Sequence, residues 1–141
     1  QYLRRDCCEI TGIPPVQDES TDEIVIKIAL LMGLNLDVEE ISVSHRLPTR
    51  GEFYSSRLRL ATRSSGRNVD PGLQYPRIIV KFVRRETKDL FYRSRKMFVG
   101  KTTKDLGLSR ISDNKIYVSE SLTAKNKELF KECLKFRRKN D

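Results

Sequence analysis

The sequence predicts an α+β fold with a four-stranded antiparallel sheet, and three observations support this. Residues 76–83 ("PRIIVKFV") alternate apolar and polar side chains, as a strand with one buried face does. Residues 19–34 ("ESTDEIVIKIALLMGL") place apolar side chains at helical spacing. Further strand-like and helix-like segments complete the order β-α-β-β-α-β, followed by an additional C-terminal helix. This is the ferredoxin-like pattern, with two helices on one face of the sheet.

Two more strands are predicted in the first half of the chain. Residues 6–14 ("DCCEITGIP") show a short alternation that stops at glycine and proline. Residues 41–47 ("ISVSHRL") predict the second strand. There the alternation places Ile41 and Val43 on one face and the two serines on the other.

Local signals mark where the first helix begins and ends. Ser20 and Glu23 form a capping box, in which a hydroxyl and a carboxylate each accept from a backbone N–H at the start of the helix. Gly33 suits a left-handed residue after its last turn. Asp37 predicts a cap for a short turn at "VEE".

The second half of the chain predicts two helices and one strand. Residues 84–98 form a basic amphipathic helix, with Leu90, Phe91 and Phe98 facing inward. Residues 115–121 ("KIYVSES") form the fourth strand. Residues 122–139 form a last helix capped by Thr123. Its expected apolar side consists of Leu129, Phe130, Cys133 and Phe136.

The segment 49–75 interrupts this pattern between the second and third strands. It is rich in Gly, Ser and Arg. It holds five arginines but only two acidic residues, Glu52 and Asp70. A connection of this length inside a compact domain is either functional or disordered. We expect a long basic insertion, mobile or with a hairpin hidden around "YSSRLRLATR".

Charge is distributed unevenly along the chain. Residues 1–40 hold 3 Lys/Arg against 9 Asp/Glu, a net charge of −6. Residues 41–83 hold 8 against 2, a net of +6, and residues 84–141 hold 17 against 8, a net of +9. The asymmetry suggests a polyanionic partner for the later two-thirds. Nucleic acid is favoured over an anionic membrane, because the chain has no lipidation motif.

The three cysteines predict reduced thiols rather than a disulfide framework. Cys7 and Cys8 are adjacent, Cys133 is left over, and there is no C-x-x-C pair. This indicates an intracellular protein, cytoplasmic or nuclear. The longest apolar stretch is too short to cross a bilayer, so no membrane partner is expected. The chain begins at Gln1 without an initiator Met, and we expect it to be a fragment.

The predicted topology is shared by RNA-recognition motifs (RRMs), which stack bases on aromatic side chains of their central strands. In "RIIVKF" the two stacking positions hold Arg77 and Ile79, and in the first strand the position holds Glu9. Aromatic readout is therefore largely absent. Tyr117, facing outward, is the one candidate stacking ring on the sheet, or else an edge tyrosine without a role.

Several segments together resemble a known family. "ITGIP", "HRLPTR", "PRIIVKF", "KTTKDLG" and "KIYVSESLTAKNKELFKECLK" are similar to the C-terminal domain of the baculovirus few-polyhedra (FP) protein and to arthropod retroelement Gag-like proteins. A more distant likeness is to the RNA-binding region of LINE retrotransposon first-ORF proteins. The resemblance covers residues 5–139. Two departures are an apparent insertion at 51–74 and the lack of a β-hairpin after the last helix.

The resemblance implies an RRM-like domain over residues 5–121 and, at 122–141, the start of a truncated small C-terminal domain. It implies binding of single-stranded RNA or DNA with little sequence preference. In the LINE proteins the contact depends on arginines between the sheet domain and the small C-terminal domain. An upstream coiled coil often oligomerises such chains, which implies self-association.

His45, the only histidine, has no Cys or carboxylate beside it in "HRLPTR" that would make it a metal ligand or part of a catalytic triad. No nucleophile–base pair or Gly-rich phosphate loop occurs, so we expect neither an enzyme nor a cofactor. We interpret His45 as a packed strand-end residue. Arg46 would then lie on the opposite, open face with Arg77 and Lys81.

The predicted function is phosphate-dominated binding of single-stranded nucleic acid, most readily RNA. The predicted contact residues are Arg46, Arg77, Lys81, Arg84, Arg85, Arg93, Arg95, Lys96 and Tyr117. The alternative is a protein-interaction module that docks a partner on Ile79 and Tyr117, with specificity from the acidic first forty residues.

Overall fold

The computed structural model describes residues 4–47, 75–108 and 113–140. Within them, four strands form an antiparallel sheet in the order β2-β3-β1-β4. The strands are β1 (Cys7–Thr11), β2 (Ile41–Arg46), β3 (Ile78–Phe82) and β4 (Tyr117–Glu120). The helices are α1 (Thr21–Leu31), α3 (Arg85–Ser94), α4 (Ala124–Asn140) and the 3-10 helices η2 (Val38–Glu40) and η4 (Arg95–Phe98).

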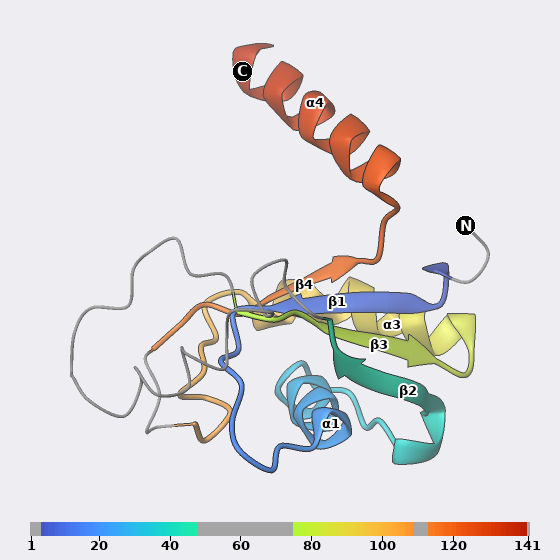
Figure 1. Cartoon of the computed structure of the whole chain (residues 1–141), viewed down its shortest axis with the longest axis vertical. Coiled ribbons are helices and arrows are strands. Elements are labelled where there is room, and N and C mark those ends of the chain that lie inside the picture. Colours follow the sequence, from blue (N-terminus) through green and yellow to red (C-terminus); the bar gives the residue numbers. More distant parts are fainter. Residues whose placement is uncertain (1–3, 48–74, 109–112, 141) are drawn as a thin grey trace.

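This α+β architecture is compatible with a ferredoxin-like arrangement, although η2, η4 and α4 add to the simple β-α-β-β-α-β order. Figure 1 shows α1 and α3 on one side of the sheet and α4 on the other. We call the side without α1 and α3 the open face. The insertion predicted at 49–75 falls almost entirely outside the described residues.

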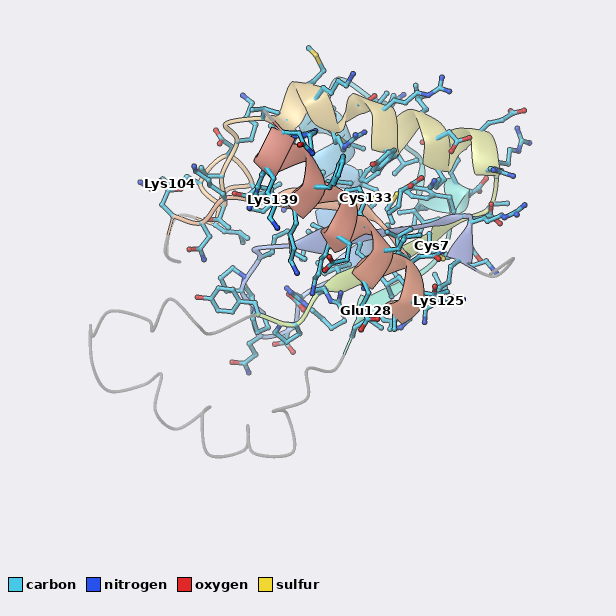
Figure 2. All side chains as sticks on the ribbon, turned by 90° about the horizontal axis from the view of Figure 1, so that it is seen from above. Cys7, Lys104, Lys125, Glu128, Cys133 and Lys139 are labelled. Atoms are coloured by element: carbon cyan, nitrogen blue, oxygen red, sulfur yellow. The ribbon has the colours of Figure 1, made fainter. Side chains whose placement is uncertain are left out.

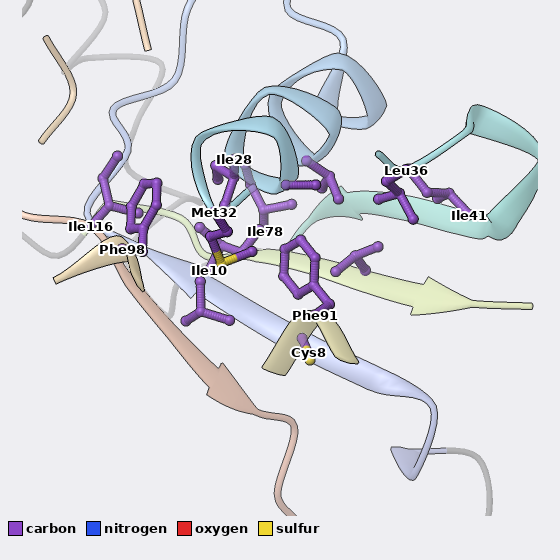
Figure 3. Packing of buried hydrophobic residues seen from close by; sticks show 14 of the residues in the cluster. Cys8, Ile10, Ile28, Met32, Leu36, Ile41, Ile78, Phe91, Phe98 and Ile116 are labelled. Atoms are coloured by element: carbon purple, nitrogen blue, oxygen red, sulfur yellow. The ribbon is translucent and has the colours of Figure 1, made fainter. Parts of the chain in front are cut away.

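The core lies between the sheet and the two helices α1 and α3. Alternate residues of the central strands point into it, among them Ile10, Ile78 and Val80, each at most 1% exposed. Phe82 and Phe91 meet there with ring centroids 5.1 Å apart. Figure 3 shows this packing, in which α1 and α3 cover the inner face of β1 and β3. The predicted alternation of β3 is therefore confirmed.

The face assignment predicted for β2 is wrong from Val43 onward. Ile41 pairs with Phe82, but the next paired residue, Val43, lies opposite Lys81, so the register shifts between them. A bulge of this kind adds one residue and reverses the alternation that follows. Val43 and His45 consequently lie on the open face, and Ser44 and Arg46 on the helix side.

The predicted helix ends are mostly confirmed. The Ser20 side chain accepts from the N–H of Glu23, and Gly33 is left-handed with φ of 81°. The Thr123 hydroxyl accepts from the N–H of Asn126 at the start of α4. In α3, Phe91 is buried as predicted, but Leu90 is exposed because it lies on the outer side of the helix.

Candidate nucleic-acid interface

The open face of the sheet presents a mixed surface of cations, apolar groups and one aromatic ring. Lys81 and Ile79 of β3 point to it and are half-buried. Tyr117 of β4 is 61% exposed there, which confirms that it faces outward. Such a ring offers a stacking surface to a nucleobase.

A buried carboxylate lies near the middle of this face. The side chain of Glu9 is only 4% exposed, and its Oε2 accepts from Nη1 of Arg77 at 2.8 Å. The hydroxyl of Ser121 donates to its Oε1 at 3.2 Å. Arg77 itself stays 42% exposed. Arg77 therefore lies on the open face as predicted, but it is held by an acidic partner rather than left as an isolated surface cation.

The third partner of Glu9 comes from α4. Nζ of Lys127 lies 3.2 Å from both carboxylate oxygens, so the first turn of α4 is tied to the sheet. Beyond this contact the helix rises from the sheet and leans back over it, as Figures 1 and 2 show from two directions. Lys125 and Lys139 mark its two ends in Figure 2.

Arg46 does not join this surface, which corrects the prediction that it lies beside Arg77 and Lys81. The bulge in β2 turns it toward the helix side, where it binds Glu19 through Nε and Nη2, both at 2.7 Å. Its remaining N–H groups donate to three backbone carbonyls, those of Ile13, Pro14 and Pro76. Arg46 therefore organises loops at one end of the sheet and has little capacity left for phosphate.

The contact with Arg46 shifts the pKa of Glu19. Burial raises the pKa of its carboxyl, but hydrogen bonds from Arg46, the Arg46 charge and the Val16 N–H together outweigh burial. The net result is a pKa below the ordinary value, so this carboxylate is charged at neutral pH.

His45 is exposed on the open face opposite Ile79, so the prediction that it packs at the strand end is also wrong. The polar residue that packs inward is its neighbour Ser44, which contacts Thr21 and Asp22 at the start of α1. The serines of β2 therefore do not mark the solvent side. Ser44 is tolerated inside because hydroxyl and carboxylate partners satisfy it.

The predicted basic track along the second helix lies on the other layer. Arg93 and Lys96 are exposed on α3 and η4, beneath the sheet. Arg95 is half-buried, stacked 3.7 Å from the centre of the Tyr92 ring, and donates to the Tyr92 carbonyl. These three cations are separated from Arg77, Lys81 and Tyr117 by the thickness of the sheet, so the predicted residues do not form one continuous strip.

A basic cleft of about 270 Å³ lies at the end of the sheet where β1 begins and β4 ends. Its cations come from two distant segments, Arg4 and Arg5 before β1 and Arg85 and Lys88 in the first turn of α3. The other lining residues are Glu120, Ser121, Leu122, Thr123 and Asn126. Nη1 of Arg4 donates to the Leu122 carbonyl at 3.0 Å, which fixes the N-terminal segment against the start of α4.

The one carboxylate of this cleft is already engaged. Oε1 of Glu120 lies 2.6 Å from Nζ of Lys88. Burial lowers the pKa of Lys88, but the hydrogen bond and charge of Glu120 outweigh it and raise that pKa, so the lysine is charged. The cleft therefore has an excess of positive charge, with Arg85 exposed at its rim. Guanidinium groups and hydroxyls are suitable donors for phosphate oxygens.

Of the predicted residues, only Arg85 lies in the cleft and only Arg77, Lys81 and Tyr117 lie on the open face. Sequence reasoning missed Arg4, Arg5, Lys88 and Lys127, because segments far apart in the chain bring them to the site. One signal was available: a carboxylate at an outward position of a central strand, Glu9, requires a cationic partner if it is covered.

No group of three or more His, Cys, Asp or Glu side chains that could hold a metal ion occurs among the described residues. None of the helices in that part of the chain is long and apolar enough to cross a bilayer. Comparisons of the chain with protein-family models, curated proteins and solved structures found no match.

Proposed function

We propose that this domain binds single-stranded nucleic acid, with RNA as the expected target, through its phosphates and with little sequence preference. The observation that carries the proposal is the basic cleft. It is lined by four cations, Arg4, Arg5, Arg85 and Lys88, and by a single carboxylate, Glu120, which already pairs with Lys88. Phosphate contacts of this kind dominate affinity for nucleic acid and carry no sequence information.

The surroundings of the cleft support the same function. The open face adds Arg77, Lys81 and the exposed Tyr117, and the basic helix α4 starts at the cleft and passes over that face. A single nucleic-acid strand bound on the open face would reach the cleft at the end of the sheet. The sheet order is also that of RRMs, although fold alone does not assign function.

A filter-binding titration of single-stranded RNA at several salt concentrations tests the proposal. The log of the binding constant should fall with the log of salt by about 0.7 for each phosphate neutralised. Arg4→Gln/Arg85→Gln should flatten this slope by roughly two contacts' worth. Lys104→Gln/Lys115→Gln removes the same charge from exposed positions outside the cleft, and serves as the matched control.

Two results would contradict the proposal. One is the absence of binding at low salt. The other is an equal effect of the two double variants on the salt slope. That result would show that the cleft contributes only through the net charge of the protein.

The alternative is a protein-interaction module in which Ile79 and Tyr117 dock a partner. The exposed apolar side chains of α4 favour it, because surfaces of this kind are typical of protein contacts. Capture of a protein partner that is insensitive to salt, together with no RNA binding, would support this alternative.

A further inference from the structure

Three parts of the chain that are far apart in the sequence form the walls of the basic cleft. They are the segment before β1, the start of α3 and the connection from β4 to α4, which Figure 1 shows at one end of the sheet. Two contacts tie these walls together. Nη1 of Arg4 donates to the Leu122 carbonyl, and Nζ of Lys88 binds Oε1 of Glu120. The cleft is therefore held in shape by the folded chain itself.

The size of the cleft suits the end of a strand rather than a stretch of it. Its volume of about 270 Å³ lies just below the range of about 300–1,000 Å³ that is typical of small-molecule sites. One phosphate group with its sugar fits such a space, whereas a run of several nucleotides does not. The rest of a strand that ends here would lie outside the cleft, along the open face.

The positive charge in the cleft exceeds what a phosphate inside a strand requires. Four cations and one carboxylate line it, a net charge of +3. Asp89 also approaches Lys88, at 3.4 Å, but it does not line the cleft. A phosphodiester inside a strand carries one negative charge. A terminal phosphomonoester carries about −1.5 to −2 at pH 7 and offers three strong acceptor oxygens. The charge of the cleft therefore favours a terminal phosphate.

Several donors in the cleft are available to such a group. Arg85 is exposed and makes no hydrogen bond or ion pair with the described residues. Arg4 uses one N–H group on the Leu122 carbonyl, and a guanidinium has five. The Thr123 hydroxyl accepts from the N–H of Asn126, so its own proton remains able to donate. Guanidinium groups and a hydroxyl are suitable donors for the oxygens of one phosphate.

Lys88 contributes its charge from the wall of the cleft rather than from its rim. Its side chain is 7% exposed, whereas its partner Glu120 is 42% exposed. Salt and water screen a buried charge much less than an exposed one. The buried ammonium therefore adds to the attraction for an anion that enters the cleft.

We propose that the cleft binds the terminal phosphomonoester of a single strand, so that the domain recognises a strand end without reading its sequence. The inference rests on the proposed function, because the following phosphates of the strand bind outside the cleft. Arg4 and Arg85 bind the terminal oxygens, Thr123 donates to one of them, and Lys88 adds its charge. A 5′-phosphate and a 3′-phosphate share this chemistry, and the experiment distinguishes them.

Calorimetric titration of the 141-residue chain with three single-stranded RNAs at low salt tests the proposal. Two are the same ten-nucleotide RNA with a 5′-phosphate or with a 3′-phosphate. The matched ligand is an RNA of eleven nucleotides with hydroxyls at both ends, so that all three contain ten phosphate groups. At least one phosphorylated RNA should bind about tenfold more tightly than the matched ligand, a difference of about 1.4 kcal/mol. Tighter binding of one of the two identifies the end that enters the cleft.

A pair of variants assigns this difference to the cleft. Arg85→Gln should abolish it, because it removes a guanidinium that has no partner among the described residues. The matched control is Lys27→Gln, which removes a cation from an exposed position of α1 outside the cleft and should keep the tenfold difference. Circular dichroism checks that both variants are folded.

Protection of the terminal phosphate is a measurement on the parent protein that needs no variant. With nine-tenths of the preferred RNA bound, alkaline phosphatase should release the terminal phosphate about tenfold more slowly, because only free ends are cleaved. Arg85→Gln, at a concentration that binds the same fraction of RNA, should protect the phosphate much less. Equal rates with and without the parent protein would show that the strand end lies outside the cleft.

The outcomes separate recognition of the strand end from the proposed function. Equal affinity for all three RNAs would overturn recognition of the end and leave the proposed function intact. A difference in affinity that Arg85→Gln leaves unchanged would overturn the assignment to the cleft. Absence of binding for all three RNAs at low salt would overturn the inference and the proposed function together.

Discussion

Arg46 and Glu19 form a two-point ion pair that joins the end of β2 to the loop before α1, with both nitrogen–oxygen distances at 2.7 Å. The two side chains are 16% and 15% exposed. With three carbonyls added, the guanidinium donates all five of its N–H groups. This contact organises the segment that carries the chain from β1 into α1.

We therefore predict that Arg46→Met destabilises the fold by about 3 kcal/mol, because it leaves a largely buried carboxylate and three carbonyls without their donor. Urea unfolding followed by circular dichroism measures the loss. The matched control is Arg93→Met on the exposed side of α3, which should change stability by less than about 0.5 kcal/mol. A similarly small change for Arg46→Met would show that its contacts with Glu19 and the three carbonyls contribute little to stability.

The same pair predicts the acid limit of stability. The folded-state pKa of Glu19 lies below its ordinary value of 4.5, so its contribution is fully present above that pH and is lost as pH falls through the lowered value. Glu19→Gln should be less stable than the parent near neutral pH, and the difference should shrink below about pH 4.5. Unfolding free energies measured from pH 7 to pH 3 provide the comparison. A difference that does not change with pH would contradict the assignment.

The overall topology could be predicted from the sequence because it depends on local patterns. Alternation in β3 and helical spacing in α1 are strong signals where one face of each element packs on a core. The face of β2 could not be predicted, because a single extra residue in a bulge reverses every later side chain. The serines then appeared to mark solvent, although Ser44 is bonded to the start of α1.

The candidate site was predicted only in part, for a related reason. Arg77 and Tyr117 were found because their positions on strands determine which way they point. The cleft around Arg4 and Arg85 depends on where the N-terminal segment, the start of α3 and the β4–α4 connection meet in space. Local pattern contains no such information, and neither does it show that Lys127 returns to Glu9.

Arg77 has a second role that its exposure alone does not suggest. Its truncation to alanine should cost about 1–2 kcal/mol of stability, because the buried Glu9 carboxylate loses one of its charged donors but keeps Lys127 and Ser121. Lys81→Ala on the same face is the matched control, since Lys81 makes no ion pair with the described residues. Thermal unfolding of both variants measures the difference, and equal stability would show that Lys127 and Ser121 satisfy Glu9 without Arg77.

The three thiols should differ sharply in reactivity. Burial raises the pKa of Cys8 to about 12 and also raises the pKa of Cys7, so little thiolate forms at either position near neutral pH. Cys133 is exposed on α4. A disulfide-exchange reagent such as 5,5′-dithiobis(2-nitrobenzoate) should therefore release one equivalent quickly from the folded chain and the rest only slowly. Cys133→Ser should remove the fast phase, and unfolding in guanidinium should make all remaining thiols fast. If Cys7 or Cys8 reacted as fast as Cys133 in the folded protein, the start of β1 would have to open readily, and the packing of Cys8 beneath α3 would not be a stable part of the core.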